Sequence, residues 1–132
     1  MKIRTDFVSN SSSSSFIVNE HNKTIFEQCF PGRKLIDLND IIVKLINMHS
    51  FMTEQYESLE RIVGDKYYSG KMFDDIFYDI ESLKTSLQEN IEDLQQIQYE
   101  HDGDSEVYIS EPIDRDRAYN LNFNAEVFKG DL

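Results

Sequence analysis

The sequence predicts an α+β protein in which a long antiparallel helical hairpin packs on a small antiparallel sheet. In the middle of the chain, apolar residues recur at alternating steps of three and four, over about 40–63 and 71–100. A short connector with Gly64 and Gly70 at its ends separates these two patterns. Near both ends of the chain, short segments alternate between apolar and polar residues. We expect a single domain spanning 1–132.

The first helical pattern is unusually regular and predicts a seam packed along its length against a partner helix. Asn39 is a suitable N-cap, and Gly64 is a suitable stop. The expected seam consists of Leu38, Ile42, Leu45, His49, Met52, Tyr56, Leu59 and Val63.

The second pattern predicts a helix of similar length, and the short connector makes the two helices antiparallel neighbours. Two separate helices of an ordinary bundle are the alternative interpretation. The expected seam of the second helix consists of Phe73, Ile76, Ile80, Leu83, Leu87, Asn90 or Ile91, Leu94 and Ile97.

The N-terminal segment predicts two strands joined by a serine-rich loop. Residues 1–8 alternate between apolar and polar types, and residues 16–18 form a short apolar run. Between them lie five consecutive serines, residues 11–15, which favour a plain loop. The alternative is that their hydroxyls and amides cradle an anion beside Lys2 and Arg4.

This N-terminal stretch, Lys-x-Arg-x-Asp-Phe-Val-Ser-Asn followed by five serines and Phe16, resembles one found in other proteins. Similar stretches recur at the start of small uncharacterised bacterial and phage-encoded proteins. The segment 106–110 is similar to a strand near the other end of some of them. The resemblance covers about 18 residues and assigns no chemistry. It implies a phage or mobile-element setting, in which many small proteins bind and block host machinery.

The remaining segments predict one short helix and further strands. Residues 19–30 suit a helix with Ile25, Phe26, Cys29 and Phe30 on one face, and 33–37 suit an extended segment. A strand is expected at 107–110, and the clearest alternation, at 119–127, predicts another. Cys29 lies among apolar residues, which favours a buried structural thiol over a nucleophile.

The formal net charge of −12 is concentrated in the second half of the chain, where residues 64–100 hold nine acidic and three basic residues. Such a surface repels nucleic acid and attracts basic protein surfaces, although acidity also serves solubility alone. No apolar run is long enough for a membrane span. A single cysteine fits a reducing compartment, so we expect the protein in the host cytoplasm.

The hairpin tip is the candidate partner-binding surface. Aromatic residues there exceed what the expected seam needs, and aspartates are interleaved with them. Exposed aromatic side chains ringed by acids suit a protein interface, whereas burial under the N-terminal segment is the alternative. The candidate residues are Tyr67, Tyr68, Met72, Asp74, Asp75, Phe77, Tyr78 and Asp79.

No catalytic or cofactor signature is recognisable in the sequence. The sequence therefore favours a non-enzymatic acidic protein that blocks the basic, nucleic-acid-binding surface of a host protein such as a defence-system component. A structural protein that self-associates through the hairpin, as a homodimer or a larger oligomer, is the second hypothesis. The third is a metal-dependent enzyme, with His101, Asp102, Asp104 and Glu106 as weak ligand candidates. A solvated acidic turn is the simpler interpretation of those four residues.

Overall fold

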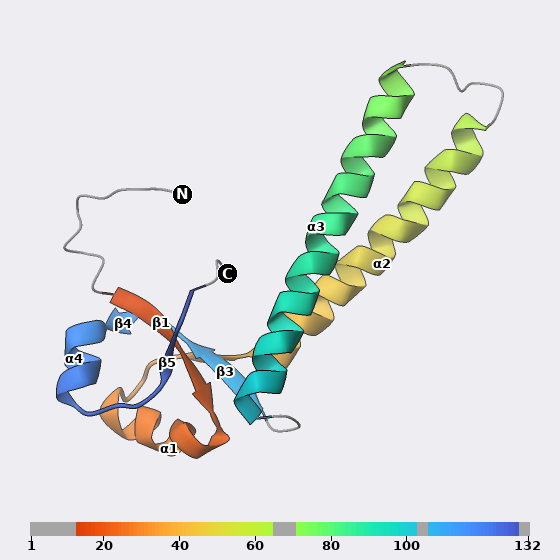
Figure 1. The fold of residues 1–132 in the computed structure, drawn as a ribbon. Helices are drawn as coiled ribbons and strands as arrows, with labels where there is room; N and C mark the ends of the chain where they lie inside the picture. Colours follow the sequence, from red (N-terminus) through yellow and green to blue (C-terminus); the bar gives the residue numbers. More distant parts are fainter. Residues whose placement is uncertain (1–12, 65–70, 103–105, 130–132) are drawn as a thin grey trace, which may run out of the picture. The chain divides into compact units, whose positions relative to one another are not determined.

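The computed structural model describes residues 13–64, 71–102 and 106–129, without the side chains of Lys71, Met72 and Asp102. The chain divides into two compact units. We call residues 40–97 the hairpin unit, and the described residues on either side of it the sheet unit. Four helices and a small antiparallel sheet make up the described chain, which confirms the α+β class (Figure 1).

Strand β1 (Ser13–Asn19) is the centre of the antiparallel sheet. It pairs with β3 (Val107–Ser110), β4 (Ile113–Asp114) and β5 (Glu126–Phe128). The short strand β2 (Leu35–Asp37) pairs with the other edge of β3. The sheet therefore joins segments from both ends of the sequence, as predicted.

The sheet unit has a buried apolar core on one face of β1. Helix α1 (Glu20–Cys29) and helix α4 (Arg115–Asn120) both contribute to it. The ring of Phe123 lies 5.6–5.9 Å, between centroids, from three other phenylalanine rings. Cys29 is half-buried against this core. The buried members are Phe16, Val18, Phe26, Phe30, Tyr108, Ile113, Ala118 and Phe123.

The strand predicted over 119–127 is wrong for most of its length. Asp114 caps α4, because its carboxylate accepts hydrogen bonds from the Asp116 and Arg117 amides. The helix then ends in a Schellman motif: the Phe123 amide donates to the Ala118 carbonyl (2.9 Å), and the Asn122 φ is +58°. This turn directs Phe123 into the core, and only β5 is extended.

The serine run is also partly extended. Ser13, Ser14 and Ser15 belong to β1, so the predicted loop is wrong for these three residues. The strand at 16–18 and the helix after Asn19 are confirmed, and the Asn19 side chain accepts from the Asn22 amide as an N-cap. The expected strand at 1–8 lies outside the described residues.

The two long helices are confirmed. Helix α2 spans Leu38–Val63 and α3 spans Lys71–Asp102, and they run antiparallel (Figure 1). Gly64 ends α2 with a φ of +65°, and its amide donates to the Glu60 carbonyl at 2.9 Å. Asn39 is not the N-cap, since α2 already begins at Leu38. None of the described helices combines the length and hydropathy needed to cross a membrane.

Candidate protein-binding surface

The seam of α2 is confirmed, but it is incompletely covered. All eight predicted residues are buried or half-buried. Ile42 is 3% exposed and Val63 is 9% exposed. The five seam residues between them are only half-buried: Leu45, His49, Met52, Tyr56 and Leu59. Helix α3 therefore covers part of the apolar stripe that α2 carries.

The seam of α3 differs from the prediction at three positions, the third being Ile97, which is half-buried but falls one residue before the continued register. Phe77 and Lys84 lie in the seam, whereas the predicted residues Ile76 and Leu83 are 39% and 58% exposed. The observed seam keeps the alternating steps of four and three. Its residues are Phe73, Phe77, Ile80, Lys84, Leu87, Ile91 and Leu94.

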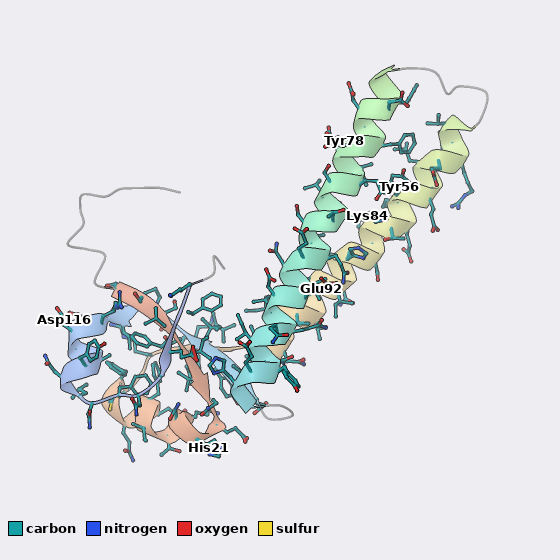
Figure 2. All side chains as sticks on the ribbon, viewed as in Figure 1. His21, Tyr56, Tyr78, Lys84, Glu92 and Asp116 are labelled. Carbon is teal, nitrogen blue, oxygen red and sulfur yellow. The ribbon has the colours of Figure 1, made fainter. Side chains whose placement is uncertain are left out.

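Tyr56 explains why Phe77 and Lys84 occupy the seam. The Phe77 ring packs edge-on against the Tyr56 ring, with centroids 5.2 Å apart. The Lys84 ammonium lies 5.2 Å from the Tyr56 ring centroid and 3.9 Å from the Glu81 carboxylate. Figure 2 shows Tyr56 and Lys84 between the two helices. Burial, with the charges of Glu60 and Glu81, raises the pKa of Tyr56.

Tyr78 is the exposed aromatic residue of this end of the hairpin. Its side chain is 71% exposed and lies on the side of α3 turned away from α2 (Figure 2). The exposed carboxylates of Asp74, Asp75 and Asp79 lie within one helical turn of it. No basic residue occurs in the sequence from Asp74 to Glu81. An aromatic ring within a cluster of carboxylates can bind an apolar side chain flanked by Lys or Arg.

The predicted site residues therefore divide into three groups. Asp74, Asp75, Tyr78 and Asp79 are exposed together on the first turns of α3. Phe77 is half-buried against Tyr56, so it is part of the hairpin seam rather than a surplus aromatic. Tyr67 and Tyr68 lie outside the described residues, and so does the side chain of Met72.

The two edges of the seam have opposite chemistry. In an antiparallel helix pair, every second seam residue is preceded by a residue at one edge of the seam. These preceding residues lie along the same edge on both helices. We call this set the apolar flank; none of its eight members is ionisable. They are Ile41, Met48, Gln55 and Ile62 of α2, and Ile76, Leu83, Asn90 and Ile97 of α3.

We call the opposite edge the acidic flank. It is formed by the residues that directly follow the remaining seam residues within residues 40–97, those not used to define the apolar flank. Three of its seven members are acidic, and none is basic. Its members are Ile46, Thr53 and Glu60 of α2, and Asp74, Glu81, Gln88 and Gln95 of α3.

Large apolar side chains on the apolar flank are exposed to solvent. Met48 is 51% exposed, Ile62 is 74% exposed and Leu83 is 58% exposed. Beside Met48, the Phe51 ring is 61% exposed and lines a hollow of about 350 Å³ on α2. Exposed apolar side chains along one edge of a helix pair are a candidate interaction surface. Neither this flank nor Phe51 was among the predicted site residues.

The weak metal-ligand candidates have other partners in the sheet unit. The His101 Nε2 atom lies 2.9 Å from the Glu126 carboxylate, and Glu106 accepts a hydrogen bond from the Tyr108 hydroxyl at 2.5 Å. Asp104 and the Asp102 side chain lie outside the described residues. Within the described part of the chain, no three His, Cys, Asp or Glu side chains are grouped as metal ligands would be.

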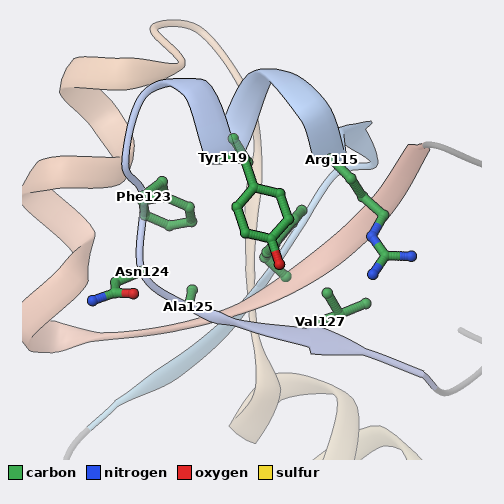
Figure 3. A pocket seen from close by; sticks show the side chains of 8 residues that line it. Arg115, Tyr119, Phe123, Asn124, Ala125 and Val127 are labelled. Carbon is green, nitrogen blue, oxygen red and sulfur yellow. The ribbon is translucent and has the colours of Figure 1, made fainter.

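A small cavity of about 160 Å³ lies in the sheet unit beside α4 (Figure 3). Phe16 and Phe123 form part of its wall, and Arg115, Tyr119 and Asn124 supply its polar groups. These residues include no nucleophile paired with a base, so the lining itself offers no acyl- or phosphoryl-transfer chemistry.

Comparison with known proteins does not assign the chain to a family: no family model, no curated protein and no solved structure matches it.

Proposed function

We propose that the protein is a non-enzymatic acidic binding protein that docks on a basic surface of another protein. The observation that carries this proposal is the cluster around Tyr78, where an exposed ring is surrounded by Asp74, Asp75 and Asp79. Carboxylates supply the charge to which Lys and Arg side chains respond, and the ring supplies the apolar contact that gives an interface its strength.

The charge of the whole hairpin unit supports the same proposal. Residues 40–97 contain twelve acidic and five basic residues, a formal net charge of −7. One of those five cations, Lys84, lies within the seam beside Glu81. A field of this sign accelerates encounter with a basic partner and repels nucleic acid directly.

The partner class that fits best is a protein whose basic surface normally binds nucleic acid. The carboxylates of the hairpin would then occupy positions otherwise taken by phosphates, and the two ligands would compete. The resemblance of the N-terminal stretch to phage-encoded proteins favours a host protein, such as a defence-system component, as the target.

The test is affinity capture from host lysate, followed by competition with nucleic acid. Asp75→Asn/Asp79→Asn is the test variant. Glu89→Gln/Asp93→Asn is its matched control, because it removes the same charge two heptads further along the same face of α3. We expect the native chain and the control to capture the same basic protein, and the test variant to lose it. Binding of that protein should weaken as salt is added.

Displacement of nucleic acid from the captured protein completes the test. The native chain should release bound nucleic acid from that protein, and the Tyr78→Ala variant should release it less effectively. Two results would contradict a docking site around Tyr78. One is capture that does not weaken in high salt, and the other is an equal loss of capture in both double variants.

A further inference from the structure

We infer that the apolar flank is the interface of a two-fold homodimer, in which two hairpins form a four-helix bundle. This inference does not depend on the proposed function, because no residue of the apolar flank belongs to the cluster around Tyr78. It starts from the half-buried seam and the exposed side chains beside it, including Ile62, Ile76 and Leu83.

The sequence pattern of both helices is that of a bundle rather than of an isolated pair. An isolated helix pair needs apolar residues only at the seam, a stripe of two positions in seven. Helices with a third apolar position beside the seam have a wider stripe, typical of helices that contact two neighbours. Met48 and Ile62 on α2, with Ile76 and Leu83 on α3, provide this third position.

Charge identifies a second copy of this chain as the occupant. Two hairpin units, each with a net charge of −7, repel one another least when they meet through the side with the fewest carboxylates. The apolar flank has no ionisable member, whereas the acidic flank has three carboxylates. Packing through the apolar flank places both acidic flanks on the outside. The apolar flank itself offers no carboxylate to a basic partner, so a second copy suits it better.

The size of the surface is sufficient. Helix α2 has 26 residues, so the side of the hairpin centred on the apolar flank is about 39 Å long and, with two helices, about 20 Å wide. This side also includes Phe51 and Lys44 beside the flank. Two such faces bury roughly 1,600 Å² in total, the size of a standard stable interface. A two-fold arrangement uses the same surface on both copies, so each substitution acts twice.

Sedimentation equilibrium of the full chain tests the inference. Leu83→Gln and Ile62→Gln are the test variants, and Ile46→Gln is the matched control, because Ile46 is 41% exposed on the acidic flank. All three sites are exposed, so each variant should keep the native helical circular dichroism. We expect a native mass of two chains at high micromolar concentration, with association strengthened by salt.

Each test variant should weaken the dimer at least about tenfold, because the change removes an apolar contact from both copies. The control should leave the dissociation constant within about twofold. A mass of one chain at every concentration would overturn the inference, and so would equal weakening by Ile46→Gln. The expected salt dependence is opposite to that of the basic partner, so failure of one proposal is distinguishable from failure of the other.

Discussion

The two units of this protein differ in how completely each buries its own apolar residues. In the sheet unit, Val18 and Phe26 have no exposed surface, and aromatic rings pack around Phe123. In the hairpin unit, the seam is half-buried from Leu45 to Leu59, and side chains such as Ile62 remain exposed. The core around Phe123 is buried, whereas the seam of the hairpin unit is open.

Under the two proposals above, this difference separates a structural region from a binding region. A closed core leaves little apolar surface for a partner to cover, and its stability comes from packing within the unit. An open seam leaves apolar surface that binding can still bury, and burial there adds stability. The acids around Tyr78 and the bare apolar flank both belong to the open unit. We therefore place the binding functions there.

The largest effect should follow from opening the closed core. Phe26 is fully buried and packs against the rings of Phe30 and Phe123. Phe26→Ala should lower the free energy of unfolding by about 3–5 kcal/mol, because it leaves a cavity that the sheet cannot collapse into. A urea titration, monitored by hydrogen exchange of the β1 and β3 amides, measures this loss of stability. A loss near that of an exposed residue would contradict the closed core.

A smaller effect should follow from removing one hydroxyl of the sheet unit. Ser110 is 2% exposed, and its Oγ accepts the Phe16 amide at 2.9 Å, between the β1–β3 and β1–β4 pairings. Ser110→Ala leaves that buried amide without a partner and should lower the free energy of unfolding by about 1–3 kcal/mol. The control Ser86→Ala, on the exposed surface of α3, should change it by less than about 0.5 kcal/mol.

A smaller loss still is expected in the open seam. Leu87 lies in the α3 seam and is only half-buried. Leu87→Ala should lower the stability of the hairpin by about 1 kcal/mol at low protein concentration, since much of the side chain is already hydrated. Hydrogen exchange of the α3 amides measures this. A loss as large as that for Phe26→Ala would show that the hairpin is closed after all.

The last effect appears only at alkaline pH. The hydrogen bond to Glu106, together with burial, raises the pKa of Tyr108 from 10.0 to about 12. The folded state therefore favours the neutral phenol. Its contribution is complete below the unfolded pKa and is lost as the pH rises through about 12.

Urea titrations of native protein and Tyr108→Phe across this range check that sign. The native sheet unit should lose stability between the two pKa values, and the variant should lose less of it. Parallel declines in both proteins would show that Tyr108 does not cause the effect. Tyr56 is the comparable tyrosine of the hairpin unit, because its pKa is also raised.

The hairpin could be predicted from the sequence because its signal repeats over many turns. The α2 seam was predicted at all eight positions, since each apolar residue supports the register set by its neighbours. The α3 seam was harder, because Ile76 and Phe77 are adjacent and both apolar. Hydropathy favoured Leu83 over Lys84, whereas the lysine stem packs beside Tyr56.

The C-terminal segment shows where short patterns fail. The alternation from Tyr119 to Val127 is typical of a strand, but the Asp114 cap and the Asn122 turn form local hydrogen bonds that compete with it. Over so few residues, the intrinsic propensities of the residues could not distinguish a strand from this capped helix and turn. Of the candidate site, the acids and Tyr78 could be predicted from composition, but the apolar flank required the corrected α3 register.

Hydrogen exchange of the intact chain at low and high protein concentration tests the central claim, that the hairpin unit is open and a second copy closes it. We predict that amides within 40–97 become more protected as the concentration rises, because association stabilises only the unit that it covers. Amides of β1 and β3 should exchange at the same rate throughout. Exchange of the hairpin amides that does not change with concentration would contradict this account.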